Sequence, residues 1–143
     1  MELKVSKPNR CYESVIIFHP DATETDQKSF FSKQKSVLES FKGEFNHIDT
    51  WGKRRLSNPI EKVRMGTFFH TTFVAQPECV AELERTMRIN DQILRFINVK
   101  LDDRKSITQH LEAIREIQKR SVEKEQEREK AFQRKQANRR KPN

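Results

Sequence analysis

Residues 12–21 read Tyr-Glu-Ser-Val-Ile-Ile-Phe-His-Pro-Asp, and this stretch decides how the fold begins. Its first part, Tyr12 to Phe18, is short, β-branched and aromatic, which predicts a strand in the middle of a sheet. Pro20 ends the strand because proline fixes φ and has no amide hydrogen for a sheet ladder. The four residues at positions 15–18 are the longest apolar run in the chain. Because a membrane span needs about 18 such residues, we expect none here.

Downstream of this strand, the sequence predicts a helix and then a second strand. The helix begins at Thr25 and carries one broad apolar stripe made of Phe30, Phe31, Val37, Leu38 and Phe41. Gly43 is expected to end it, since glycine is common just past a helix C-terminus. The second strand is expected from Glu44 to Leu56, with the large apolar residues Phe45, Ile48 and Trp51. Asn58-Pro59 and Gly66 are each expected to mark a turn or an irregular connection.

The remaining elements complete a recognisable order. Thr67 to Val74 is rich in aromatic residues and predicts a third strand. Pro77 suits the first turn of a second helix, whose apolar positions are Val80, Leu83 and Met87. A last strand is expected from Ile93 to Leu101. The order strand, helix, strand, strand, helix, strand predicts an α+β fold of the ferredoxin-like βαββαβ type, with two helices on one face of a four-stranded antiparallel sheet.

The composition changes after Leu101. Residues 102–143 hold 13 basic, 8 acidic and only 9 apolar residues. We therefore divide the chain into an N-terminal extension (1–9), a ferredoxin-like domain (10–101) and a charged C-terminal helix or tail (102–143). One long helix is expected there, with a short apolar stripe of Ile107, Leu111, Ile114 and Ile117. Beyond Val122 little apolar surface remains, so we expect that part to be frayed or disordered in the free protein.

The residue types argue against an enzyme. The chain has only 3 glycines in 143 residues, and no P-loop, GxGxxG, HExxH or GxSxG motif is present. The four histidines are scattered over different predicted elements, and the two cysteines, Cys11 and Cys79, lie 68 positions apart. That spacing indicates neither a zinc site nor a disulfide framework. We expect no catalytic residue, no cofactor and no metal, in a cytoplasmic protein whose N-terminus lacks the apolar core of a secretory signal.

The chain is rich in basic residues, which give it a formal net charge of +8 and a pI near 9.7. Lys53, Arg54 and Arg55 are consecutive, and Arg88 and Arg95 flank a predicted turn. Such clusters bind phosphate oxygens through charge, and arginine adds bidentate hydrogen bonds. The charge therefore favours a nucleic-acid partner, with an acidic protein or a membrane surface as the alternatives.

Four stretches resemble one family in order and spacing. Residues 51–60, Trp-Gly-Lys-Arg-Arg-Leu-Ser-Asn-Pro-Ile, resemble the Gly-x-basic-polar-Leu-small-Tyr-Pro-Ile signature of the sixth protein family of the bacterial small ribosomal subunit. The other three stretches are residues 10–13, 19–21 and 83–95. The sequence departs from the family pattern at Asn58, where tyrosine is typical, at Glu61, and in its long basic tail.

The resemblance implies a structural ribosomal protein that binds the central domain of small-subunit ribosomal RNA together with the eighteenth small-subunit protein. It implies RNA contact by Arg10, Tyr12, Arg88 and Arg95. From charge and position we add Lys53, Arg54 and Arg55, and from the tail Arg134, Lys135, Arg139, Arg140 and Lys141. Their expected role is phosphate and sugar binding. Tyr12 either stacks on a base or belongs to the core.

Two other functions stay open at this point, because a ferredoxin-like fold hosts many activities. The first is a small enzyme or ligand-binding regulator, which would need a pocket with convergent polar groups. The second is a protein–protein adaptor that uses the long helix, which sustained apolar heptads would favour. The exposed edge of the second strand, near Trp51, suits a protein partner. The ribosome in question is bacterial or organellar.

Overall fold

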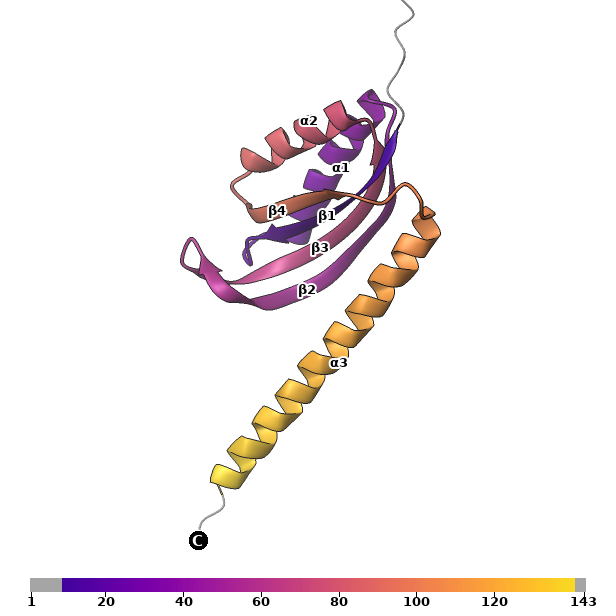
Figure 1. Ribbon diagram of the computed structural model, residues 1–143. Coiled ribbons are helices and arrows are strands. Elements are labelled where there is room, and N and C mark those ends of the chain that lie inside the picture. Colours follow the sequence, from indigo (N-terminus) through magenta and orange to yellow (C-terminus); the bar gives the residue numbers. More distant parts are fainter. Residues whose placement is uncertain (1–8, 141–143) are drawn as a thin grey trace, which may run out of the picture. The chain divides into compact units, whose positions relative to one another are not determined.

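The computed structural model describes residues 9–140. Seven elements follow one another along the chain: β1 (Arg10–Phe18), α1 (Glu24–Ser40), β2 (Glu44–Ile60), β3 (Val63–Ala75), α2 (Pro77–Arg88), β4 (Ile93–Lys100) and α3 (Ile107–Arg139) (Figure 1). They form two compact units, of which the first ends at Asp103 and the second begins at Arg104. The second unit consists of α3 and the residues that flank it.

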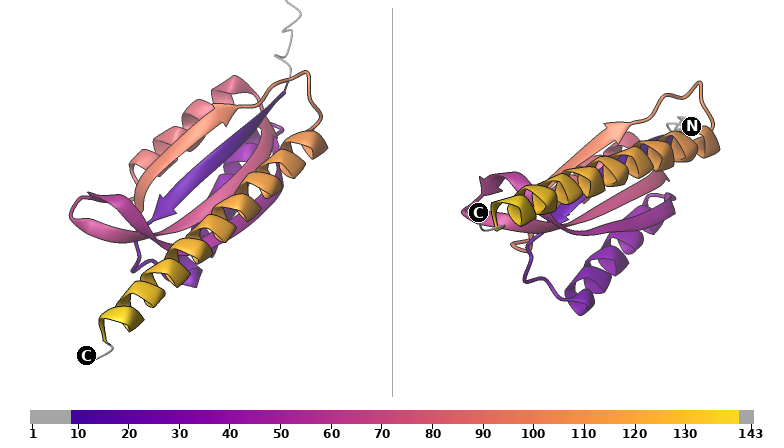
Figure 2. Two further views of the ribbon diagram at one scale, coloured as in Figure 1. Left: turned by 60° about the horizontal axis from the view of Figure 1, so that its bottom comes forward. Right: turned by 90° about the horizontal axis from the view of Figure 1, so that it is seen from below.

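The first unit is a four-stranded sheet in the order β2-β3-β1-β4, with all neighbouring strands antiparallel. Helices α1 and α2 cover the same face of this sheet (Figures 1 and 2). The predicted ferredoxin-like α+β fold is therefore confirmed, with β1 in the interior of the sheet as expected. Strands β2 and β4 form its two edges.

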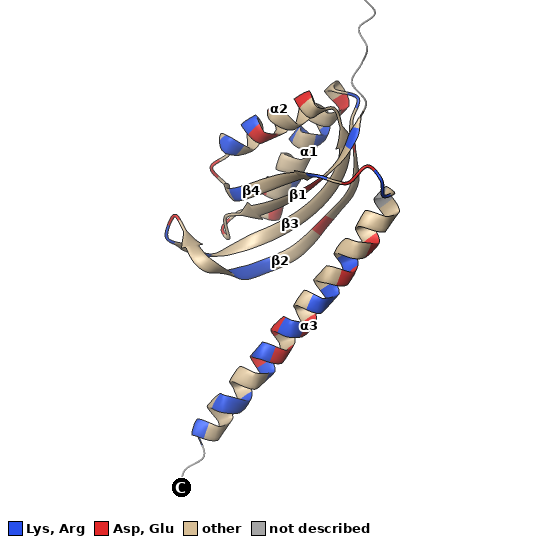
Figure 3. Cartoon of the chain, in the orientation of Figure 1, with Lys and Arg blue, Asp and Glu red and all other residues tan. Residues whose placement is uncertain are grey.

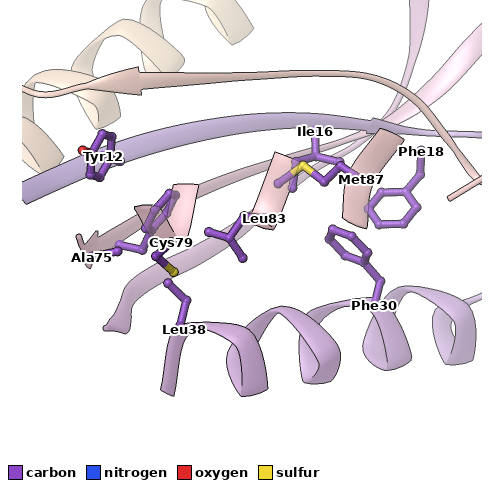
Figure 4. Close-up of a cluster of buried hydrophobic side chains, with 10 residues drawn as sticks. Tyr12, Ile16, Phe18, Phe30, Leu38, Ala75, Cys79, Leu83 and Met87 are labelled. Atoms are coloured by element: carbon purple, nitrogen blue, oxygen red, sulfur yellow. The ribbon is translucent and has the colours of Figure 1, made fainter. Parts of the chain in front are cut away.

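The alternation of side chains along β1 determines which residues enter the core. Tyr12, Ser14, Ile16 and Phe18 are buried beneath the helices, while the residues between them face the other side of the sheet. The helices contribute apolar side chains at helical spacing, as predicted (Figure 4). The buried apolar cluster consists of Tyr12, Ile16, Phe18, Phe30, Leu38, Phe73, Ala75, Cys79, Leu83 and Met87.

Helix α1 begins and ends with specific caps. Thr23 and Asp26 form a capping box at its N-terminus. At its C-terminus the amide of Gly43 donates to Leu38 O at 2.7 Å and that of Lys42 donates to Glu39 O at 3.1 Å, a Schellman arrangement. The residue in the left-handed conformation is Lys42, at φ 58°, so the prediction that Gly43 ends the helix is wrong by one position. Gly43 is needed for a different reason, since a Cβ there would lie 2.6 Å from Val74 O.

The β2–β3 hairpin is longer than predicted. Asn58-Pro59 lies inside β2 and Gly66 lies inside β3, so neither is the turn of the hairpin. Asn58-Pro59 does mark an irregular connection, because the pairing of β2 with β3 shifts between Arg55 and Ile60. Proline is tolerated at this position because β2 is an edge strand and residues 56–59 have no paired residue on β3, so its missing amide hydrogen breaks no ladder. At Gly66 a Cβ would lie 2.5 Å from Ile17 Cγ2, so glycine permits a close approach between β3 and β1. The turn itself is at Glu61 and Lys62, both at positive φ.

Helix α3 starts with a second capping box, in which Ser106 accepts from the Gln109 amide and the Gln109 side chain accepts from the Ser106 amide. The helix continues without a break to Arg139, so the expectation of fraying beyond Val122 is wrong for this structure. The physical reason is composition, because residues 123–137 are nearly all Glu, Lys, Arg, Gln and Ala, which favour helix, and include no Gly or Pro. Within residues 9–140, no helix is long and apolar enough to cross a membrane.

Candidate nucleic-acid interface

Arg10 opens β1 and has an acidic neighbour. Its guanidinium forms an ion pair with Asp103 Oδ2, and Lys100 Nζ lies 3.4 Å from the same oxygen. The Arg10 side chain is still 39% exposed. Because Asp103 is shared by two cations, the pair of basic residues keeps a net positive charge next to the sheet. The sequence prediction missed Asp103, although its position just after the last strand was visible.

Tyr12 belongs to the core. Its ring is 8% exposed and stacks on Phe73 with ring centroids 5.5 Å apart. Burial raises the pKa of its phenol, and the nearby Arg10 cation partly opposes that shift. In this structure the ring is not available for stacking on a base. Tyr12 therefore packs in the core in this structure, and does not offer its ring to a base.

Arg88 and Arg95 lie on opposite sides of the sheet. Arg88, in the last turn of α2, donates to Glu84 Oε2 at 3.1 Å, and its guanidinium lies 6.0 Å from the Phe96 ring centroid. Phe96 pairs with buried Ile16, so it faces the helices, whereas Arg95 pairs with Ile17 and faces the other way. An RNA that contacts both arginines therefore has to pass around the β4 edge.

The basic run Lys53, Arg54 and Arg55 lies on β2, at the other edge of the sheet (Figure 3). A bulge next to Gly52, which has φ 75°, inserts Trp51 into the strand. The Arg54 guanidinium lies 5.8 Å from the centre of the Trp51 ring, a cation–π arrangement. The bulge thus places an aromatic ring and a cation next to each other on the sheet edge.

Trp51 is held by a residue that the sequence prediction treated only as a packed or surface histidine. The rings of Trp51 and His70 stack with centroids 5.6 Å apart and an interplanar angle of 4°. His70 is 2% exposed, and its Nε2 lies 3.2 Å from Glu13 Oε2. The register, in which His70 pairs with Val15, places this contact on the sheet face away from α1 and α2. A buried histidine that supports a tryptophan is a packing element.

The remaining predicted residues lie in the second unit. Arg134, Lys135, Arg139 and Arg140 are all exposed at the C-terminal end of α3. Lys141 lies outside the described residues, as do residues 1–8 of the N-terminal extension. The sequence suggested one set of RNA-binding residues. The structure separates them into a group near β1, α2 and β4, a group on β2, and a group on α3.

No catalytic or metal centre accompanies these basic groups. In the part of the chain that the structure describes, no three metal-ligating side chains gather, and Cys11 and Cys79 are free thiols. Fold and surface together define a class of small, basic, ferredoxin-like proteins that present cations on both edges of the sheet.

Comparison with known proteins identifies the family. The family model of ribosomal protein S6 matches residues 11–100. The chain therefore belongs to this family of the bacterial small ribosomal subunit. "Small ribosomal subunit protein bS6" of Bdellovibrio bacteriovorus is 44% identical over 113 residues, which are 79% of this chain and 74% of that protein. The protein of the same name from Trichlorobacter lovleyi is 39% identical over 94 residues, 66% of this chain and 77% of that protein.

A solved structure has the same fold. The 30S ribosomal protein S6 from Thermotoga maritima superposes with a TM-score of 0.60 at 22% identity, and the alignment covers 77% of this chain and 98% of that one. The family is a structural component of the ribosome, so the prediction that this chain is not an enzyme is confirmed.

Proposed function

We propose that this ribosomal protein binds the central domain of small-subunit ribosomal RNA, in the cytoplasm, together with the eighteenth small-subunit protein. The supporting observation is that the family match over residues 11–100 includes basic residues at both edges of the sheet. Lys53–Arg55 lie on the β2 edge and Arg95 on the β4 edge, and Arg88 at the end of α2 lies near Phe96 of β4. Cations on both edges let one domain contact RNA segments on two sides. Their role is to bind phosphate and sugar, which positions the protein without reading sequence.

The RNA proposal is tested with the double variant Arg88→Ala and Arg95→Ala in the full chain. Charge-assisted phosphate bonds contribute about 1–3 kcal/mol each, so the double variant should assemble into small subunits at least tenfold less well. Lys28→Ala with Lys33→Ala is the matched control, because it removes two exposed cations from α1. Equal assembly of the two double variants would contradict the proposal.

The two single variants separate RNA binding from helix stability. Arg88 pairs with Glu84 and is placed where a cation favours the helix dipole, so Arg88→Ala should also lower the melting temperature. Arg95 is exposed on the open face of β4, and Arg95→Ala should weaken RNA binding without that loss. Thermal melts alongside filter binding measure both effects on the same samples.

For the eighteenth small-subunit protein we propose the β2 edge near Trp51. An edge strand offers unpaired main-chain donors and acceptors, and Ile48 on β2 is 42% exposed. Ile48→Asp should weaken binding to that purified protein by tenfold or more in calorimetry. Ile97→Asp is the control, because Ile97 is 57% exposed on the opposite edge strand, β4. If Ile97→Asp weakens the complex and Ile48→Asp does not, the partner binds at the β4 edge instead.

For the basic end of α3 we propose phosphate contact as well, by Arg134, Lys135, Arg139, Arg140 and Lys141. The support is composition, because residues 131–143 contain five basic residues and no acidic one. Such a segment gains affinity for a polyanion by releasing condensed counterions.

A further inference from the structure

Helix α3 has an aromatic residue in the middle of its basic end. Phe132 is 61% exposed, and Ile117, nearer the start of the helix, is 65% exposed. Phe132 follows Ile114 by 18 residues, which is about five full turns at 3.6 residues per turn. The side chains of Phe132 and Ile114 therefore project from the same side of the helix. We call this side the Phe132 face; its basic residues are Lys124, Arg128, Lys135 and Arg139.

Acidic side chains are concentrated on the opposite side. Four glutamates of α3 project away from the Phe132 face, and the charged residues there balance, with Lys119, Arg120, Lys130 and Arg134 against Glu112, Glu116, Glu123 and Glu127. On the Phe132 face two glutamates, Glu125 and Glu129, oppose four cations. The Phe132 face is therefore the basic side of the helix, and the opposite side is its neutral side. Figure 3 shows that residues of both charges occur along α3.

The two sides also differ in whether their basic side chains form ion pairs. On the neutral side Arg120 Nη2 lies 2.6 Å from Glu116 Oε1. On the Phe132 face, no ion pair joins Arg128, Lys135 or Arg139 to another side chain within residues 9–140, and all three are exposed. Their charges are available to an external anion. Arg128 and Arg139 lie roughly 16 Å apart along the helix axis, enough to follow several nucleotides of one strand.

We propose that the Phe132 face is a distinct RNA-binding surface, on which Arg128, Lys135 and Arg139 bind phosphates and Phe132 stacks on an unpaired base. This inference deepens the proposed function and rests on it. Combining cations with an aromatic ring on one surface is the general solution for binding single-stranded nucleic acid.

Charge and polarity favour RNA over a lipid surface. A helix that lies in a membrane interface needs a continuous apolar side. Between Ile117 and Phe132 the same side carries Ser121, Lys124 and Arg128 instead. One exposed aromatic ring surrounded by cations suits an RNA strand, in which phosphates alternate with bases. It does not suit lipid acyl chains, which are entirely apolar.

The experiment compares two triple variants of the full-length protein that remove the same charge. Arg128, Lys135 and Arg139 are changed to Gln in the first, and Lys119, Arg120 and Lys130 are changed to Gln in the second. Glutamine keeps the helix propensity, which circular dichroism checks. Affinity for central-domain ribosomal RNA is measured against salt, with the eighteenth small-subunit protein present. The first variant should lose about 2 units of salt slope, at roughly 0.7 per phosphate, and the second less than half a unit.

Phe132 is tested separately, because stacking does not depend on salt. Phe132→Ala should weaken RNA binding about tenfold, and Phe132→Trp should restore it, since base–aromatic stacking tolerates a larger ring. Equal loss in both triple variants, or an unaffected Phe132→Ala, would overturn the inference while the proposed function stands. Wild-type protein that does not bind the RNA overturns both. Binding to phosphatidylglycerol vesicles is measured as well. If the protein binds these vesicles through Phe132 and does not bind the RNA, this face is a lipid-binding surface.

Discussion

At the scale of single residues, Leu83 shows how the core depends on α2. Its side chain is 1% exposed and lies between Cys79 and Met87 in the buried cluster (Figure 4). Leu83→Ala removes buried methyl groups and leaves a cavity, so it should lower the free energy of unfolding by about 2–5 kcal/mol. Urea denaturation followed by Trp51 fluorescence measures this change. A loss below about half a kcal/mol would mean that α2 does not pack on the sheet in this register.

The end of α1 offers a contrast between neighbouring residues. Lys42 adopts a left-handed conformation that costs a residue with a Cβ about 1–2 kcal/mol, partly offset by the greater chain entropy of glycine when unfolded. Lys42→Gly should therefore raise stability by about 0.5–1 kcal/mol. Gly43→Ala should lower it, because the new Cβ would overlap Val74 O. Both variants are compared with wild type in the same urea titration, and a destabilised Lys42→Gly would contradict the Schellman geometry.

The predicted site residues show what can and cannot be read at this scale. Tyr12 alternates with Ile16 and Phe18 along one strand, so its burial follows from the period of two. Arg88 and Arg95 are both visible as basic residues around a turn. That they occupy opposite faces depends on the pairing of Ile16 with Phe96, a long-range contact that the local sequence does not specify.

At the scale of elements, the hairpin turn between β2 and β3 is under strain. Glu61 and Lys62 have φ values of 48° and 66°, the two positive values of a type I′ turn, which Asn-Gly satisfies best. Changing Glu61 to Asn and Lys62 to Gly should raise the free energy of unfolding by about 0.5–1.5 kcal/mol. Glu61→Ala with Lys62→Ala is the control, because alanine gains nothing at positive φ. A melting temperature unchanged in the Asn-Gly variant would show that the turn adopts another conformation.

The same hairpin explains why element ends were harder to predict than element types. Every strand and helix of the βαββαβ order was predicted from apolar spacing. The second strand, however, was expected to end at Leu56, before a turn or irregular connection at Asn58-Pro59, whereas β2 continues to Ile60. Proline interrupts a central strand and is harmless on an edge. Whether β2 is central or at an edge is decided by strand order, which is a property of the whole sheet.

At the scale of the whole molecule, charge distribution governs binding to RNA. Deleting residues 131–143 removes five basic residues and lowers the formal net charge from +8 to +3. If two to four of the five contact phosphates, the salt slope of RNA affinity should fall by about 1.5–3.5. The measurement uses ribosomal RNA with the partner protein present. An unchanged slope would show that this segment stays in solvent.

The sequence by itself determined the class of the protein and its family. Apolar periodicity set the order of strands and helices, the shortage of glycine argued against phosphate-cradling enzyme motifs, and residues 10–95 carried the family resemblance that comparison confirmed over residues 11–100. These are local properties, which neighbouring residues along the chain express without any folded contact.

Only the tertiary structure decided how the basic residues are grouped. Strand order separates Lys53–Arg55 from Arg95 by the width of the sheet. Register places Arg95 on the face away from the helices, whereas Arg88 lies on α2, which covers the other face. The support of Trp51 by His70 and Glu13 likewise joins three strands. The physical reason is that strand pairing brings together residues distant in sequence, and a one-residue change of register would transfer every side chain to the other face.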